Sequence, residues 1–171
     1  MNVTFTRTGE RRYRVSVEGP GLISSCMEPA AGYDARLPHD MAHFVVENEL
    51  GITGGVFGQL AGGGHARTFH PNDERASRKL AKRGKRLAAA NRGDAMLSEK
   101  VIFLAWRTWN NDLSGLTPLE GVSAEDISRV CREFDAVSAI WSKLAVGESM
   151  TLVWRGRAAR AARRRPSRRH S

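Results

Sequence analysis

The chain has 171 residues, of which 41% are hydrophobic and 26% are charged, and this balance excludes a disordered chain and suits one domain with a buried core. The formal net charge is +9, but eight arginines and no acid fall in 155–171, so the preceding part carries 19 basic and 18 acidic residues. No apolar run approaches the roughly 18 residues that span a membrane, and the first residues read as a strand rather than a secretory signal. We therefore expect a cytoplasmic protein.

The two ends of the chain predict strands. Residues 2–8 and 11–18 alternate apolar and polar side chains, which is typical of a hairpin with one buried face. Residues 151–155 read as a last strand that could pair with this hairpin, whereas residues 22–36 are ambiguous and leave room for one more short extended piece. The predicted fold is α+β: a small antiparallel sheet from the N-terminal hairpin and the C-terminal strand, packed by four or five helices in a single globular domain over residues 1–155.

Five segments between these strands predict helices. The first begins near Pro38 and ends before Gly51, which is a natural terminator. The second covers 54–64, with glycines at intervals of four, and the third covers about 73–90 and is rich in Arg and Lys. A break at 91–94 precedes an apolar helix over 98–109, which we expect at the centre of the fold. The last helix opens at Ser123, where Asp126 suggests a capping box.

The first helix carries the residues that most resemble a chemical site. His39 and His43 are four residues apart, so their imidazoles share one helix face and could bind one metal ion. The spacing resembles the His-Glu-x-x-His motif of zinc metalloproteases, in which the acid after the first histidine activates a metal-bound water. Here Asp40 takes that place, and its shorter side chain would stand further from the water. The hypothesis is a metal-binding protein of zincin-like character and a candidate metal-dependent hydrolase, with Asp40 as the catalytic acid–base residue.

Glu47 extends the pattern and is the candidate third metal ligand. It lies eight residues after His39 on a helix that rises about 1.5 Å per residue, so one straight helix would struggle to bring all three groups to one ion. Either the helix distorts, or Glu47 supports a ligand, or the third ligand comes from elsewhere. The other candidates are His65, His70, Asp73 and Glu28. Zinc is the expected metal, and iron is the alternative because two histidines and a carboxylate also suit it.

A wider pattern supports a resemblance. Pro-His-Asp-x-x-His-Phe-Val-Val-Glu from Pro38, with a late Gly-Glu-x-x-x-Leu-x-Trp from Gly147, resembles a group of small uncharacterised bacterial proteins over most of residues 1–155. The resemblance implies no known activity. A structural reading stays open beside it, in which Asp40 serves only the helix dipole and His43 and Glu47 form an ordinary pair one turn apart.

The basic segments predict a competing function. The helix over about 73–90 and the arginine-rich residues 156–171, which we expect to be disordered, could contact nucleic acid or an acidic partner. Such binding would be weak, sequence-independent and sensitive to salt, because Arg and Lys release counterions from phosphates. The alternative to the metal-site hypothesis is therefore a non-enzymatic binding protein. The sequence implies no membrane contact and sets no oligomeric state.

Overall fold

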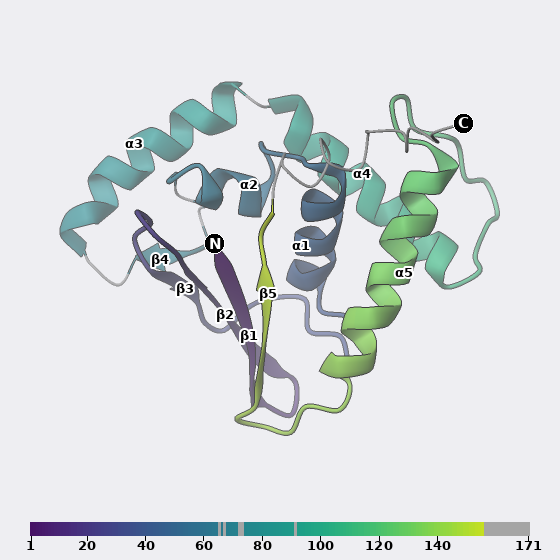
Figure 1. Ribbon diagram of the computed structural model, residues 1–171, viewed down its shortest axis with the longest axis horizontal. Helices are drawn as coiled ribbons and strands as arrows, with labels where there is room; N and C mark the ends of the chain where they lie inside the picture. The colour runs from purple at the N-terminus through teal and green to yellow at the C-terminus, as the bar shows by residue number, and fades with distance from the viewer. Residues whose placement is uncertain (65, 67, 72–73, 91, 156–171) are drawn as a thin grey trace, which may run out of the picture.

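The computed structural model describes residues 1–64, 66, 68–71, 74–90 and 92–155, and it confirms the α+β class (Figure 1). The described chain forms a five-stranded antiparallel sheet in the order β4-β3-β2-β1-β5 and five helices. The strands are β1 (Asn2–Gly9), β2 (Arg12–Glu18), β3 (Ser25–Met27), β4 (His70–Pro71) and β5 (Ser149–Val153). The helices are α1 (His39–Leu50), α2 (Val56–Ala61), α3 (Glu74–Ala90), α4 (Arg92–Trp109) and α5 (Ala124–Trp141).

The predicted hairpin and the pairing of the two chain ends are both confirmed. β1 lies between β2 and β5, with Val3 opposite Val17 in one pair and opposite Leu152 in the other. The buried face of the sheet is apolar, as the alternation of residues in β1 and β2 requires. On the other face, hydroxyls pair across β1 and β5, with Thr4 Oγ1 2.9 Å from Thr151 Oγ1. The sheet is larger than the three strands predicted, because short β3 and β4 add to the edge of β2.

Helix α1 lies at the centre of the fold, between the sheet and the pair α4 and α5 (Figure 1). It begins after Pro38 and ends at Gly51, whose left-handed backbone (φ 65°) places its N–H on the Glu47 carbonyl, as glycine allows. Its residues from Met41 to Glu47 are all buried. Phe44 packs edge-on against Phe5 of the sheet, with ring centroids 6.4 Å apart. The side chains from Met41 to Glu47 are therefore enclosed by the rest of the fold.

Three helix predictions need correction. α4 is not the central helix: it buries only four residues, and Phe103 is 60% exposed. The predicted break at 91–94 is too long, because α4 already begins at Arg92, and Asn91 lies outside the described residues. The helix predicted over 54–64 is limited to Val56–Ala61, because Gly54 and Gly55 belong to the turn before it.

The last helix follows its prediction closely. The side chain of Ser123 accepts from the backbone N–H of Asp126, and the Asp126 carboxylate accepts from the backbone N–H of Ser123. This reciprocal capping box satisfies two donors at the start of α5 that would otherwise lack partners. The buried residues of α5 recur at helical spacing and end at Trp141, which is fully buried against Tyr13 of the sheet.

Candidate metal centre

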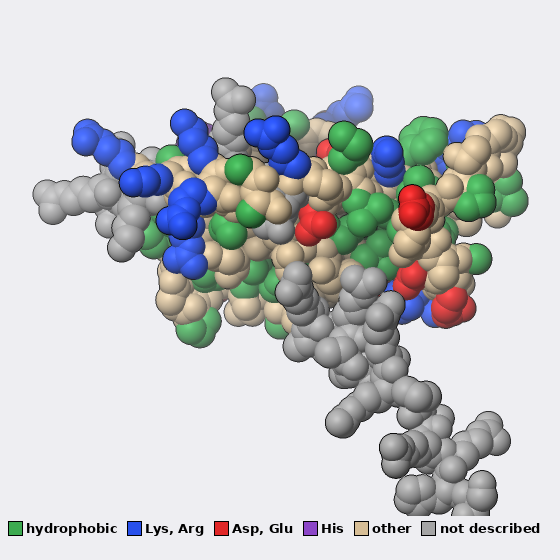
Figure 2. Space-filling model, turned by 90° about the horizontal axis from the view of Figure 1, so that it is seen from above, with side chains coloured by type: hydrophobic (Ala, Val, Ile, Leu, Met, Phe, Trp, Pro, Cys, Tyr) green, Lys and Arg blue, Asp and Glu red, His purple; other side chains and the backbone are tan. Residues whose placement is uncertain are grey.

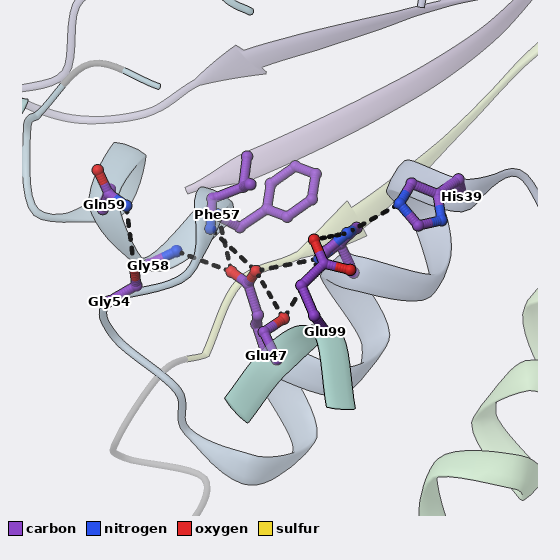
Figure 3. Close-up of polar contacts among 10 residues, drawn as sticks. His39, Glu47, Gly54, Phe57, Gly58, Gln59 and Glu99 are labelled. Carbon is purple, nitrogen blue, oxygen red and sulfur yellow. Dashed lines mark hydrogen bonds and ion pairs between the residues drawn. The ribbon is translucent and has the colours of Figure 1, made fainter. Parts of the chain in front are cut away.

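His39 and His43 face each other on α1, as their spacing predicts. Their Nε2 atoms lie 3.1 Å apart, and their rings meet edge to face (Figure 3). His39 is exposed at the start of the helix, and its backbone N–H donates to the Gly32 carbonyl. A Cβ at Gly32 would lie only 2.7 Å from the Cβ of His39, so a glycine lets this loop pack directly on the histidine. His43 is buried, with 6% of its surface exposed.

The third member of the cluster is Glu99, from the first half of α4. Its Oε1 lies 3.4 Å from His43 Nε2, and its side chain is 64% exposed (Figure 3). One ligand atom from each of His39, His43 and Glu99 lies within 4.8 Å of the others, which is close enough to hold a metal ion. Ligand atoms of a tetrahedral zinc site with bonds of about 2.0 Å lie about 3.3 Å apart. The two short separations, at 3.1 and 3.4 Å, match that value, and the Glu99 side chain that would close the third is exposed.

Glu47 lies on the other side of the His43 ring. Its side chain is fully buried, and its Oε1 is 3.6 Å from His43 Nδ1, the nitrogen that faces away from His39. The same carboxylate accepts hydrogen bonds from the backbone N–H groups of Val56, Phe57 and Gly58, at 2.9, 2.8 and 3.2 Å. Glu47 is thus placed to support His43 and to start α2, and the carboxylate that lies close to both histidines is that of Glu99.

Gly55 explains how α2 can begin on this carboxylate. A Cβ at Gly55 would lie 2.2 Å from Glu47 Oε1, so no other residue leaves room for the buried acid. The turn is held from outside as well: the Gly54 N–H donates to Asp94 Oδ2, and Gln59 Nε2 donates to the Gly54 carbonyl (Figure 3). The first glycines of the run, Gly54 and Gly55, therefore make a tight turn around an anion from the protein itself.

Ser98 fixes which nitrogen of His43 is free. The Ser98 hydroxyl donates to Glu47 Oε1 at 3.2 Å, and its oxygen lies 3.2 Å from His43 Nδ1. A hydroxyl has one proton to donate, so the Ser98 oxygen acts as the acceptor toward His43. Neutral His43 then carries its proton on Nδ1 and presents the lone pair of Nε2 to His39 and Glu99. Metal-binding histidines in proteins are oriented in the same way, by a polar group on the second ring nitrogen.

Charges around His43 shift its titration. Burial alone would lower the pKa of His43, but the contact with Glu47 and the charges of Glu47, Glu99 and Asp40 outweigh it and raise the pKa above its usual value. The ring is therefore surrounded by negative charge. A cation at Nε2 would experience the same field as the proton does, which favours a bound metal ion.

Asp40 reaches the sheet. Its Oδ2 accepts a hydrogen bond from the hydroxyl of Tyr13 on β2. Burial raises the pKa of Asp40 and outweighs the lowering by this hydrogen bond and by the charges of His39 and His43. Burial and the neighbouring Asp40 charge likewise raise the pKa of Tyr13. The structure thus gives Asp40 a partner in the sheet, and its role as a proton acceptor stays a prediction.

Of the other candidate ligands, Glu28 and His70 do not join the cluster, and the remaining two are not among the described residues. Glu28 pairs with Arg14 at 3.4 Å, and His70 is paired through β4 with Cys26 of β3. His65 and Asp73 lie outside the described residues, as does the predicted tail over 156–171. Glu99 was not identified from the sequence. The available signal was weak: Glu99 is an acidic residue in the first turn of a predicted apolar helix, directly after Ser98.

A pocket of about 380 Å³ opens beside His39 and Glu99. Most of its other walls are apolar side chains from the loop before α1, from α1 and from α4. The lining residues are Gly32, Asp34, Leu37, Ala42, Ile102, Phe103 and Trp106. The cluster therefore lies at the polar edge of an apolar pocket.

Helix α3 presents a basic surface. Lysine and arginine side chains gather over α3 at the left of the upper face (Figure 2). Those that the structure describes as exposed are Arg78, Lys82, Arg83, Lys85 and Arg86. Leu87 lies close to Gly62 and Gly64 at the end of α2, and Arg83, one turn before it on the same face of α3, lies close to Gly63. The helix is thus anchored along this face, and Arg78, Lys82, Lys85 and Arg86 are exposed.

No protein-family model, characterised protein or solved structure matches this chain. The resemblance to a group of small bacterial proteins accordingly stays a prediction. Among the helices that the structure describes, none combines the length and the apolar character needed to cross a bilayer.

Proposed function

We propose that the chain is a metal-binding protein whose ion is held by His39, His43 and Glu99. One observation carries the proposal: His43 Nδ1 faces Ser98 and Glu47, while its Nε2 faces His39 Nε2 and Glu99 Oε1 at 3.1 and 3.4 Å. A histidine that only filled space in the core would not need a ring nitrogen aimed at two further ligand groups, with its other nitrogen held by two polar side chains. Two histidines and one carboxylate suit zinc, and the same set suits ferrous iron.

Hydrolysis is the activity that we propose for the loaded protein. Three protein ligands leave coordination positions open, and the ion would supply Lewis-acid chemistry there. His43 is held rigidly by the central helix, whereas exposed Glu99 can adjust its carboxylate. Asp40 follows His39 directly and is the proposed proton acceptor. Its exchange for Asn should remove activity while metal content stays unchanged; loss of metal in Asp40→Asn would instead give Asp40 a structural role.

Metal content tests the first proposal directly. Protein purified without tag or chelator is analysed for metals beside His39→Ala and Glu99→Gln, both of which change exposed side chains. His70→Ala and Glu125→Gln are matched controls, since each removes an exposed group of the same type elsewhere. We expect about one zinc or iron per chain in the wild type and in both controls, and much less in the two site variants. Absence of metal in the wild type, with added zinc and iron failing to bind, would refute the proposal.

A second candidate function follows from the exposed basic side chains of α3. They could neutralise the phosphates of a nucleic acid, and such binding weakens steeply as salt rises. The charge-reversal variant Lys82→Glu/Arg86→Glu should abolish retention on a single- or double-stranded DNA probe while metal content is unaffected. Retention that survives this double change would remove α3 from consideration.

A further inference from the structure

We propose that the pocket beside His39 and Glu99 binds the apolar part of a neutral ligand, an aromatic or branched aliphatic group attached to an oxygen donor that faces the metal. The inference deepens the metal-binding function proposed above and rests on it. It gives the substrate class of the site: neutral compounds, such as esters or amides, of an apolar acid.

One face of α4 builds both the metal cluster and the pocket wall. Glu99, Ile102, Phe103 and Trp106 occupy positions i, i+3, i+4 and i+7, so their side chains lie along a single stripe of the helix. His39 and Ala42 repeat the relation on α1, where one residue is a ligand and the other lies in the wall. A molecule bound to the ion through Glu99 and His39 would therefore extend directly along apolar side chains.

The aromatic side of the pocket is exposed and yet held in place. Phe103 is 60% exposed, although it stands in the middle of a helix with a buried face. The Arg107 guanidinium lies 5.4 Å from the centre of its ring, and Trp106 packs edge-on against Trp109 at 5.5 Å. Large exposed apolar groups near a concave site mark binding surfaces. Phe103 and Trp106 thus offer a flat, oriented surface to a ring or branched chain.

The charges of the pocket select against an anionic ligand. Among the described residues that line it there is no lysine or arginine, and the two charged carboxylates are Glu99 and Asp34. Asp34 Oδ1 already accepts from the backbone N–H groups of Arg36 and Leu37, at 2.7 and 2.9 Å. The Arg107 guanidinium near Phe103 already donates to both carboxylate oxygens of Asp112, each at 2.8 Å. A phosphate or a second carboxylate placed against the apolar walls would therefore lose its hydration without gaining a free cationic partner, which is costly.

The volume sets the size of the group. A cavity of about 150 Å³ in an apolar protein core accepts benzene, and this pocket offers about 380 Å³. A substituted ring or a chain of comparable bulk therefore fits, whereas a methyl group would leave most of the pocket empty.

Hydroxamate probes test the inference without knowledge of the natural ligand. Each probe binds the metal through its two oxygens, and the attached group reports on the pocket. Dissociation constants are measured by calorimetry on zinc-loaded, full-length protein for acetohydroxamate, benzohydroxamate and 4-carboxybenzohydroxamate. Phe103→Ala removes one wall at an exposed position, and Ile140→Ala, at another exposed apolar position on α5, is the control.

We expect benzohydroxamate to bind at least tenfold more tightly than acetohydroxamate to the wild type and to Ile140→Ala, and the added carboxylate to reverse most of this gain. In Phe103→Ala the preference should fall at least threefold, with acetohydroxamate affinity and zinc content unchanged. Equal binding of the first two probes to zinc-loaded protein would overturn the apolar class. Undiminished binding of the carboxylated probe would overturn the neutral class, and an unchanged preference in Phe103→Ala would overturn the assignment to this pocket. All three results leave the metal site standing, whereas failure to load zinc or iron refutes the proposed function and this inference with it.

Discussion

The buried carboxylate of Glu47 allows a test that separates support of the site from metal ligation. Glu47→Gln keeps the size of the side chain but replaces one oxygen with an N–H₂ group. Each oxygen of Glu47 now accepts two hydrogen bonds: Oε1 from Val56 and Ser98, and Oε2 from Phe57 and Gly58. In either orientation of the Gln amide, its NH₂ group replaces one of these oxygens and faces two protein N–H or O–H groups that can no longer donate to it.

The expected loss of stability follows from these contacts. A hydrogen bond to a charged group contributes about 1.5–3 kcal/mol. On each oxygen one bond is short and the other is long, at 3.2 Å, so we place the loss of two bonds at about 3–5 kcal/mol. For a domain of this size about 1 kcal/mol corresponds to 2–4 °C, and Tm should fall by roughly 6–20 °C. The metal affinity should also fall, by roughly 10- to 100-fold, because Glu47 orients His43.

The assay compares Glu47→Gln with Glu99→Gln. Thermal and urea unfolding of metal-free protein give the free energy of unfolding, and titration with zinc gives the affinity. Glu99 is 64% exposed, so Glu99→Gln should lower affinity and change stability by no more than about 0.5 kcal/mol. An unchanged Tm in Glu47→Gln would refute the argument, since the carboxylate would then not be needed to start α2. A stability loss in Glu99→Gln equal to that in Glu47→Gln would refute the division of roles.

Three further substitutions test separate contacts. Gly55→Ala should destabilise the protein about as strongly as Glu47→Gln, because its Cβ would lie 2.2 Å from the carboxylate; a near-normal Tm would show that the turn can move. Tyr13→Phe removes the hydroxyl that contacts half-buried Asp40 and the Ala31 carbonyl and should cost about 1–3 kcal/mol in urea unfolding, whereas no change would mean that water replaces the hydroxyl. Asp126→Ala should cost about 1 kcal/mol as a lost cap contact. Burial would raise the pKa of Asp126, but bonds from Ser123 and Arg129 outweigh this and lower it below 3.8. The loss of stability in Asp126→Ala should therefore be full above pH 4 and shrink as pH falls further, because the carboxylate of the wild type is then protonated. A loss of stability that does not depend on pH would contradict the role of the charge.

The features that the sequence predicted correctly are those that depend on residues close together in the chain. The histidine pair depends only on the helical repeat, and α1 needs only Pro38 and Gly51 to set its ends. The alternation in β1 and β2 likewise predicted both strands and the face that they bury. In each case the decisive residues are within a few positions of each other, so no knowledge of the tertiary fold was required.

Contacts between distant segments could not be predicted. Glu99 is one of 18 acidic residues, and only the packing of α4 on α1 brings it to His43. Glu47 lies on α1 itself, yet its role depends on the turn at Gly54 and Gly55, where the amides that it accepts from begin a short helix. Strands as short as β4, with two residues, carry no periodicity to detect. The apolar composition of 98–109 suggested a central helix. This prediction was wrong because composition does not show that an apolar residue such as Phe103 faces solvent at a pocket.

The position of β1 between β2 and β5 has a consequence for synthesis of the chain. Thr4 and its partner Thr151 are 147 residues apart, so at 5–20 residues per second a ribosome needs roughly 7–30 s to produce the second after the first. During that interval β1 can pair with β2 but presents its other edge unpaired, and open strand edges invite pairing with other chains. The two hydroxyl pairs, Thr4 with Thr151 and Thr6 with Ser149, and the bond from the Trp154 N–H to the Met1 carbonyl form only after residues 149–154 have been synthesised. Expression yield should therefore depend on how well chaperones protect this one edge during translation.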